Sequence, residues 1–407
     1  MQINILEKTN VQTRHVIEEF IKTAKLCGIK IYLVGGIVRD ILLSKELKDV
    51  DITVEGSVKD FVEALLKYSD ISSVKYSETL PTAKVIFSNG EEVDIASTRE
   101  EIYKNFGDLP IVTKVGCKLE DDVKRRDFTV NAIALSLNQD NLFEIIDYLG
   151  GVEDLLNKKL RLLHEKSFYD DPSRIIRAAK FIHRLDFSLD VKTLELQKEY
   201  LKNPLRNIPL FRVKAELYEF FALDNPKVFD YFVTNNLYRI FVDHFDCALT
   251  GERLISIADE YSLAEKDRPT LYFLPVFINE NVPEKLNLTI EELKIIKDTK
   301  TLFSELNTIN FSDKYSIYSF FRGKEDISVI LYAAMKNKEI TDIYFAIKDI
   351  KPITTGKDLK KLGIPQGKIY SEIIEAVQKE KINNGLKNFD FEINFVRKYL
   401  KKKGISV

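Results

Sequence analysis

The hydrophobic pattern of the chain changes character once along its length. Before about residue 150, short apolar runs of strand length alternate with helical patterns, and turn signals separate them. From residue 151 onward, one segment after another has apolar residues at helical spacing, divided by breakers such as Pro204, Pro226 and Pro269. This change predicts an α+β head with a small mixed β-sheet, followed by a region that is all-helical.

Local patterns in the head predict its elements in more detail. Residues 13–27 and 58–68 have apolar positions at helical spacing, and residues 30–35 form a buried strand that stops at glycine. Residues 73–98 alternate like two strands around an Asn89-Gly90 turn, which is a strong hairpin signal. Residues 101–121 contain Gly and Pro without clear periodicity, which predicts a long loop.

Length and composition limit the class of protein. The 407 residues exceed one compact core and predict two or three domains, or one head with a long helical extension. No apolar run approaches the length of a bilayer-spanning helix, and the N-terminus lacks a basic region followed by an apolar core. We therefore expect a cytoplasmic protein without a membrane role. Cys27, Cys117 and Cys247 lie far apart, which argues against a disulfide framework or a zinc ribbon.

A pair of glycines follows the first predicted strand, in "YLVGGIVRDILLSKELKDVDITVEG" at residues 32–56. Gly35 and Gly36 allow a ligand to approach the backbone closely. The short helix that is predicted behind them offers free N–H groups to an anion such as a triphosphate. Arg39 adds a charged fork for the same phosphates. The stretch therefore predicts a phosphate-binding turn.

Two acids begin the next predicted strand. Residues i and i+2 of a strand point the same way, so Asp49 and Asp51 project from one face. Their repulsion is tolerable if a divalent cation lies between them, and Mg²⁺ prefers oxygen ligands and phosphate partners. An Asp-x-Asp pair alone is more often a solvated strand edge, but beside the glycines it predicts phosphoryl or nucleotidyl transfer. Asp94 could complete the metal site or, equally, pair with Arg99 on an edge strand.

Four motifs carry a resemblance to a known family. They are "VGGIVRDILLSKELKDVDITVEG" within residues 32–56, "KRRDFTVNAIAL" at 124–135, "DYLGGVEDL" at 147–155 and "DDPSRIIRAAKFIHRLDF" at 170–187. In sequence and order they resemble the motifs of class II tRNA nucleotidyltransferases and bacterial poly(A) polymerases. Beyond residue 205 the similarity is weak.

The resemblance implies a fold, a reaction and partners. It implies a catalytic head over residues 1–140, a helical neck over 141–205, and a tRNA-binding body and tail over 206–407. The implied reaction transfers CMP and AMP from CTP and ATP to the tRNA 3′ end, with Mg²⁺ as the cofactor of a two-metal mechanism. Full CCA addition is the first choice, and A addition, CC addition and poly(A) synthesis are alternatives. CC-adding members of the family commonly lack part of the loop that precedes the Arg-Arg-Asp motif. Residues 96–121 show no such deletion, which weighs against CC addition alone.

The resemblance also implies roles for single residues. Asp49 and Asp51 would be the metal-binding, catalytic pair. Residues that would contact the nucleotide are Gly35, Gly36, Arg39, Asp40, Arg125, Arg126, Asp127 and Asn131. Asp171, Arg174 and Arg177 repeat at three-residue spacing, share one face of a predicted helix, and would form a protein template for the base.

Two departures from the family's motifs, and one rival interpretation, accompany these assignments. Asp170 stands where many members of the family have Glu. The family's fifth motif is altered, because "PLFRVKAELYEFF" keeps Arg212 and Glu216 but has Phe211 in place of the first glutamate. A solvated salt-bridge stripe is the alternative reading of the face with Asp171.

The C-terminal segment is basic although the whole chain has a formal charge of −2. Residues 351–407 hold 13 Lys and Arg against 6 Asp and Glu, a net charge of +7. Within "TTGKDLKKLGIPQGKIYSEIIEAV", residues 354–377, a lysine-bearing loop enters a predicted helix, which suits an RNA phosphate or an ordinary solvated face. Two rival functions are a non-catalytic RNA-binding protein and a nucleotidyltransferase for an antibiotic or a protein.

Overall fold

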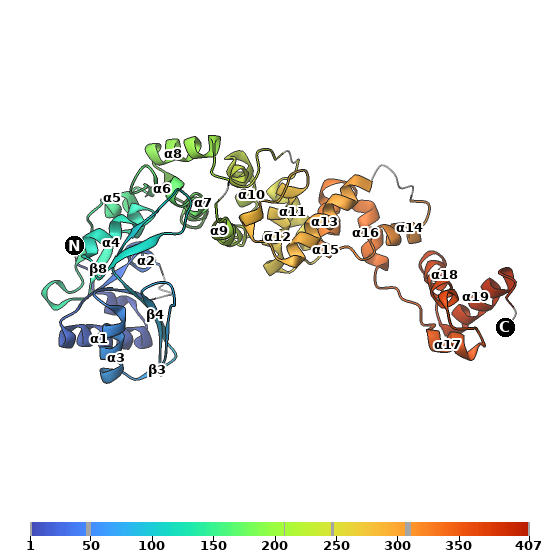
Figure 1. Ribbon diagram of the computed structural model, residues 1–407, viewed down its shortest axis with the longest axis horizontal. Helices are drawn as coiled ribbons and strands as arrows, with labels where there is room; N and C mark the ends of the chain where they lie inside the picture. The colour runs from blue at the N-terminus through green and yellow to red at the C-terminus, as the bar shows by residue number, and fades with distance from the viewer. Residues whose placement is uncertain (1, 46–49, 207, 246–247, 306–310, 406–407) are drawn as a thin grey trace. The chain divides into compact units, whose positions relative to one another are not determined.

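The computed structural model describes residues 2–45, 50–206, 208–245, 248–305 and 311–405. The chain divides into two compact units (Figure 1). The first consists of Met1–Leu223, Tyr231–Phe241 and Pro283–Asn287, and the second of Asp224–Asp230, Val242–Val282 and Leu288–Val407. No helix in these described ranges is both long and apolar enough to span a bilayer.

The first unit contains strands and helices, and its elements follow in chain order. They are α1 (Val11–Cys27), β1 (Lys30–Val34), α2 (Gly36–Leu42), β2 (Val50–Glu55), α3 (Val58–Tyr68), β3 (Ile71–Tyr76), β4 (Thr82–Phe87), β5 (Glu92–Ser97), β6 (Arg99–Ile102), β7 (Ile111–Val115), α4 (Leu119–Lys124), β8 (Ala134–Ser136), β9 (Ile145–Ile146), α5 (Gly151–Leu156), β10 (Lys159–Leu160), α6 (Ser167–Asp170), α7 (Ser173–Leu185), β11 (Ser188–Leu189), α8 (Val191–Lys202) and α9 (Phe211–Phe221). The helix α10 (Pro226–Thr234) follows.

A seven-stranded sheet in the order β3-β4-β5-β2-β1-β8-β9 forms the centre of the head. β2 and β5 are parallel and the other neighbours are antiparallel, so the sheet is mixed as predicted. The parallel register sets Asp51 directly opposite Asp94. β1 is a central strand with both neighbours in place, which explains its continuous apolar sequence.

Helices cover both faces of this sheet. α1 and α3 lie together on one face (Figure 1). There Phe20 packs against Phe61 and Phe87 at ring distances of 5.8 and 5.9 Å. On the other face, Leu119 and Val123 of α4 join a buried cluster with side chains of β1 and β8. Packing on both faces of the sheet holds β1 and β2 in place, and with them the glycine turn at the end of β1 and Asp51 at the start of β2.

Two predictions for the head are wrong in detail. Residues 73–98 were predicted to contain two strands, but a further strand, β3, precedes them. Residues 101–121 were predicted to be a long loop, but they include most of the β6–β7 hairpin and the start of α4. The side chains of β3 and β7 are mostly exposed, so the apolar alternation that marks a half-buried strand is missing. The predicted Asn89-Gly90 turn does join β4 to β5.

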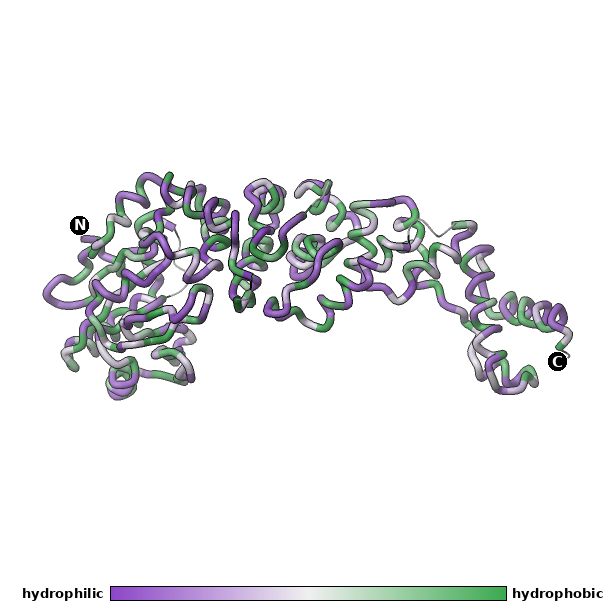
Figure 2. Tube along the Cα trace, turned by 45° about the horizontal axis from the view of Figure 1, so that its top comes forward, coloured by the Kyte–Doolittle hydropathy of each residue, from purple (hydrophilic) through white to green (hydrophobic). Residues whose placement is uncertain are grey.

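The region after residue 151 is nearly all helical, as predicted, except for the short pair β10 and β11. Helices in the remainder of the chain are α11 (Gly251–Glu260), α12 (Arg268–Phe273), α13 (Ile290–Glu305), α14 (Lys314–Phe321), α15 (Asp326–Met335), α16 (Lys338–Ile347), α17 (Gly356–Lys361), α18 (Lys368–Asn384) and α19 (Phe389–Lys402). Hydrophobic and hydrophilic residues alternate along them (Figure 2). Their apolar sides form separate buried clusters, one around Phe321 and Tyr332 and another around Ile373 and Val396.

Candidate functional site

A cavity of about 850 Å³ lies in the first unit, and it brings together most of the residues that the sequence singled out. It is lined by Gly35, Gly36, Arg39, Asp51, Arg125, Arg126, Asp127, Asn131, Asp171, Arg174 and Arg177. Of the remaining predicted residues, Asp40 does not line it and Asp49 lies outside the described residues. The lining contains eight arginines and Lys180 against five carboxylates, so the cavity suits a polyanion.

The glycine turn has the geometry that its sequence predicts. Gly35 caps the N-terminus of α2 with φ +88°, a conformation that residues with a side chain rarely adopt. A Cβ atom at this position would lie 3.2 Å from Nη1 of Arg126. Glycine therefore allows an arginine of the second motif to approach the first motif closely.

Arg39 is held in place by its neighbours. It is only 5% exposed, Nη1 donates to Oδ1 of Asn131 at 2.8 Å, and Nε donates to Oδ1 of Asp40 at 2.9 Å. Its guanidinium also lies 5.0 Å from the ring centroid of Phe181, a cation–π distance. Asp40 thus orients Arg39, and Arg39 reaches the cavity with its direction fixed.

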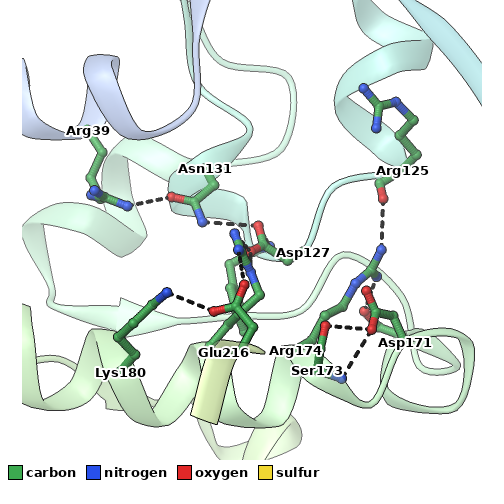
Figure 3. A network of polar contacts seen from close by, with 12 residues as sticks. Arg39, Arg125, Asp127, Asn131, Asp171, Ser173, Arg174, Lys180 and Glu216 are labelled. Atoms are coloured by element: carbon green, nitrogen blue, oxygen red, sulfur yellow. Dashed lines mark hydrogen bonds and ion pairs between the residues drawn. The ribbon is translucent and has the colours of Figure 1, made fainter. Parts of the chain in front are cut away.

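A chain of polar contacts runs from Arg39 through Asp127 to α9 (Figure 3). Oδ1 of Asp127 accepts from Asn131 at 3.0 Å, and Oδ2 accepts from Nε of Arg177 at 2.9 Å. Arg177 continues to Glu216 at 2.8 Å, and Glu216 also accepts from Lys180 at 2.7 Å. This series of contacts joins motifs that are far apart in sequence into one wall of the cavity.

The charges in this chain shift the protonation of its members. Burial alone would raise the pKa of Asp127, but Arg177 and the hydrogen bond from Asn131 outweigh it and the pKa is lowered. The pKa of Arg177 is raised in turn by Asp127 and Glu216, against the effect of burial. Both groups therefore stay charged, and they hold each other in a fixed orientation.

Asp122 supports two arginines of the cavity lining, and the sequence reasoning missed it. Its side chain is fully buried, and its oxygens accept from Nη2 of Arg125 at 2.8 Å and from Nη2 of Arg126 at 3.0 Å. Burial would raise the pKa of Asp122, but these two arginines lower it. The sequence contains a signal for these contacts, because Asp122 precedes Arg125 by three residues and Arg126 by four, which is the spacing of helical ion pairs.

The three residues that are predicted to form a base template line the same cavity, but the prediction that one helix carries all three is wrong. Arg174 and Arg177 lie on α7, whereas Asp171 lies in an extended conformation before the helix begins. The reason is Pro172, because the residue before a proline is disfavoured in the helical region. All three side chains still line the cavity. The neighbouring Asp170 is outside the lining, with its carboxylate 3.8 Å from Nε2 of His164.

The altered fifth motif reaches the template through its two retained residues. Nη2 of Arg212 donates to Oδ2 of Asp171 at 2.6 Å, and Glu216 binds Arg177 as described above. Phe211 is 43% exposed and does not line the cavity. The substitution at Phe211 thus leaves the contacts of Arg212 and Glu216 with the template in place.

Two further groups in the cavity wall were not foreseen. Lys180 follows Arg177 by three residues on α7, so the spacing that identified Arg174 and Arg177 could have extended to it. Tyr103, with Leu109 and Pro110, comes from the connection between β6 and β7. The sequence predicts a loop for that connection, and no local pattern indicates that it lies at this cavity.

Of the two acids of the first motif, Asp51 lines the same cavity, and Asp49 lies outside the described residues. Val50 is buried and Asp51 is exposed, as expected for alternate residues of β2. Asp94 contacts Lys84 at 3.9 Å, while Arg99 binds Glu101. The alternative that Asp94 pairs with Arg99 on an edge strand is therefore wrong, since β5 also lies between two strands. Among the described residues, which exclude Asp49, no group of three potential ligands could hold a metal ion.

Comparison with known proteins shows which proteins the chain is similar to. Residues 31–161 match the model of the poly(A) polymerase head domain. The chain is 30% identical to the A-adding tRNA nucleotidyltransferase of Geobacter sulfurreducens, over 90% of the chain and 44% of that protein. It is 26% identical to the CCA-adding enzyme of Lactobacillus helveticus, over 90% of the chain and 92% of that protein. The chain thus spans less than half the length of the first of these relatives.

The fold extends the similarity over nearly the whole chain. A solved CCA-adding enzyme in an apo form superposes with a TM-score of 0.81 at 23% identity, covering 97% of this chain and 98% of the other. The resemblance inferred from the four motifs is confirmed by the head-domain match and by the named relatives. Residues 31–161 therefore match a poly(A) polymerase head domain, and over most of its length the chain is similar to tRNA nucleotidyltransferases.

Proposed function

We propose that the chain completes the 3′ end of tRNA by transferring CMP and AMP from CTP and ATP, with release of pyrophosphate. One observation carries this proposal: a single positively charged cavity contains a glycine turn, an arginine cluster, and an acid–arginine pair suited to a base. These are the three parts that a nucleoside triphosphate requires. The 3′-hydroxyl of the RNA attacks the α-phosphorus, and the bond to pyrophosphate breaks.

The phosphate side of the cavity is formed by the turn and by two arginines. Gly35 and Gly36 leave the backbone accessible, and Arg126 lies beside Gly35, while Asp122 holds the guanidinium groups of both Arg125 and Arg126. Guanidinium forks bind phosphate oxygens through paired hydrogen bonds. Because Asp122 is buried and stays ionised, it orients both arginines while they neutralise the triphosphate.

The base side of the cavity has one acceptor and one donor. Cytosine and adenine each present an exocyclic amine beside a ring nitrogen that accepts a hydrogen bond, whereas uracil and guanine present a carbonyl beside an N–H. The carboxylate of Asp171 would accept from the amine and Arg174 would donate to the ring nitrogen. This pairing favours C and A over U and G without a nucleic-acid template.

The first-motif acids suit Mg²⁺ at the remaining side of the cavity. Asp51 is exposed at the start of β2, opposite Asp94, and carboxylate oxygens are the ligands that Mg²⁺ prefers. Asp49 and Asp51 would hold the ion, which when bound supplies activation of the 3′-hydroxyl and neutralisation of the phosphates. Relatives of this kind use a divalent metal, and Mg²⁺ with two ions is our proposal for this chain.

The remainder of the chain would bind tRNA. We assign the head to residues 1–140, the neck with the template to 141–205, and the tRNA-binding body and tail to 206–407. Lys357, Lys360, Lys361 and Lys368 are exposed around α17 and the start of α18, so they are accessible to RNA phosphates. With tRNA, CTP and ATP as substrates, the protein would act in the cytoplasm.

Addition of only the terminal A is the second candidate, because the relative with 30% identity is named an A-adding enzyme. The two candidates differ in which tRNA end is accepted. Purified protein is incubated with tRNA transcripts that lack the last three, two or one nucleotides, each with CTP, ATP or both, and the products are sized. Extension of all three transcripts to full length supports CCA addition.

Other product patterns identify the alternatives. Extension of only the transcript that lacks one nucleotide supports A addition, extension that stops two nucleotides on supports CC addition, and long adenylate tails support poly(A) synthesis. Loss of activity in Asp51→Asn is expected, with Glu92→Gln as the matched control. Glu92 is exposed on β5, pairs only at the surface with Lys84, and does not line the cavity. No extension of any transcript would refute the proposal.

A further inference from the structure

The carboxylate of Asp171 is nearly saturated by protein donors. Oδ1 accepts from the backbone N–H of Ser173 at 3.1 Å and from its hydroxyl at 2.6 Å. Oδ2 accepts from Nη2 of Arg212 at 2.6 Å. A carboxylate has about four acceptor positions, so these three bonds leave about one, on Oδ2, for a ligand.

Arg174 is also held by groups other than Asp171. Nη1 donates to the hydroxyl of Ser167, and Nη2 donates to the backbone oxygen of Arg125 at 3.0 Å (Figure 3). The hydroxyl of Tyr103 lies 3.5 Å from the same nitrogen. These contacts fix the guanidinium beside Asp171 while it is bonded elsewhere.

Two opposite charges three residues apart in a buried site attract each other strongly. Asp171 is 6% and Arg174 is 5% exposed, so water screens that attraction poorly. An ion pair between them would consume the acceptor and the donor that a base needs. The site therefore requires groups that keep the two side chains apart.

Arg212 is placed to do this. It is on α9, which packs against α7, and it engages the Asp171 oxygen that Ser173 does not bind. Its side chain is 36% exposed, so the contact with Asp171 is at the cavity rather than deep in the core. Ser173 anchors one oxygen of Asp171 and Arg212 anchors the other.

We propose that Arg212 is a positioning residue that determines nucleotide selectivity, because it holds the Asp171 carboxylate apart from Arg174 and leaves one acceptor for the exocyclic amine. This inference rests on the proposed function and extends it. Without Arg212, Ser173 still holds Oδ1 of Asp171, but Oδ2 can turn toward Arg174, and the pair then discriminates less between an amine and a carbonyl on the base.

The test compares four proteins: the wild-type chain, Arg212→Met, Arg212→Lys and Lys214→Met. Methionine keeps much of the arginine stem and removes the charge, and lysine keeps the charge. Lys214→Met makes a similar change on the same helix at a residue that contacts the Tyr218 ring, 5.4 Å from its centroid, and does not line the cavity. Melting temperatures show that each variant is folded.

The measured quantity is the ratio of kcat/KM for CTP to that for UTP, and for ATP to that for GTP, on tRNA acceptors. Hydrogen bonds to charged groups are worth enough for a loss of roughly 10- to 100-fold in these ratios in Arg212→Met. We expect a several-fold loss in Arg212→Lys and no change in Lys214→Met. If Arg212→Met does not fold, the ratios of Arg212→Lys decide the outcome.

A purely structural role for Arg212 gives a different result. A brace for α7 would lower kcat/KM for all four nucleotides by the same factor and lower the melting temperature, with both ratios unchanged. Unchanged ratios in an active, folded Arg212 variant would overturn this inference alone. A wild-type chain that adds no nucleotide to any tRNA would overturn the proposed function, and the inference with it.

Discussion

Replacing Gly107 with alanine should release the β6–β7 connection from α6. Gly107 has φ +75°, and its N–H donates to the backbone oxygen of Tyr169 at 2.8 Å. Beside it, the ring of Phe106 lies 5.3 Å from that of Tyr169. This docking holds Tyr103 and Leu109, the cavity-lining parts of the connection, in place.

The cost of the substitution has two parts. A left-handed backbone costs a residue with a side chain about 1–2 kcal/mol. The new Cβ would also lie 2.3 Å from Cγ2 and 2.9 Å from Cβ of Ile208, which is 6% exposed and so has little room to move. Overpacking of this kind costs about 1–3 kcal/mol, so the docked state loses about 2–5 kcal/mol.

Hydrogen exchange at the amide of residue 107 measures this loss directly. A cost of 2 kcal/mol or more corresponds to a fall in protection of roughly 30-fold or more. Gly90→Ala is the matched control, because Gly90 has φ +90° with nothing within 4 Å of the added Cβ. In the control, protection of the amide of residue 90 should fall only by the cost of the left-handed backbone, about 1–2 kcal/mol.

A double-mutant cycle separates the steric part. In an Ile208→Ala background the clash is relieved, so Gly107→Ala should cost only about 1–2 kcal/mol more than Ile208→Ala alone. Equal losses of protection at positions 107 and 90, or an unchanged cost of Gly107→Ala in the Ile208→Ala background, would refute the reasoning.

Three further substitutions test the site and its supports. Asp122→Asn should make the melting temperature fall less steeply on acidification. The lowered pKa of Asp122 gives stability that is present above about pH 4 and is lost as the pH falls through the pKa of Asp122 in the folded protein. Parallel curves of melting temperature against pH for the two proteins would contradict this. Gly151→Ala places a Cβ 2.2 Å from the backbone oxygen of Thr129, which cannot yield as a side chain can, and should cost about 1–3 kcal/mol; an unchanged melting temperature would disprove the clash. Asp51→Asn should abolish nucleotidyl transfer without lowering the melting temperature, because Asp51 is exposed, and EDTA should do the same to the wild-type chain until Mg²⁺ is restored; activity that survives either treatment argues against a metal at Asp51.

The parts of the fold that the sequence predicted are those in which one face or both faces of an element are buried. β1, α2 and β2 were located from an apolar run, a glycine pair and an alternating segment, because packing on the sheet enforces those patterns. The exposed β3 and the β6–β7 hairpin carry no such pattern. Their positions depend on tertiary contacts such as that of Gly107 with Ile208, which no local spacing records.

The candidate site was predictable where its residues lie in one motif and less so where it joins several. Arg174 and Arg177 were identified together by helical spacing, but the same spacing could not show that the helix begins only after Pro172 and so leaves out Asp171. Contacts across long sequence separations, such as Arg212 with Asp171, depend on how α9 packs against α7. Such pairs follow from the packing of helices and not from the periodicity of either one.

A crystal structure of the protein with CTP and Mg²⁺ tests the central claim most directly. We predict the triphosphate beside Gly35, Arg125 and Arg126, and the exocyclic amine of cytosine within hydrogen-bond distance of Asp171. An ion bound by Asp51 should lie next to the α-phosphate. A nucleotide bound outside this cavity, or a cytosine that faces away from Asp171, would contradict the account.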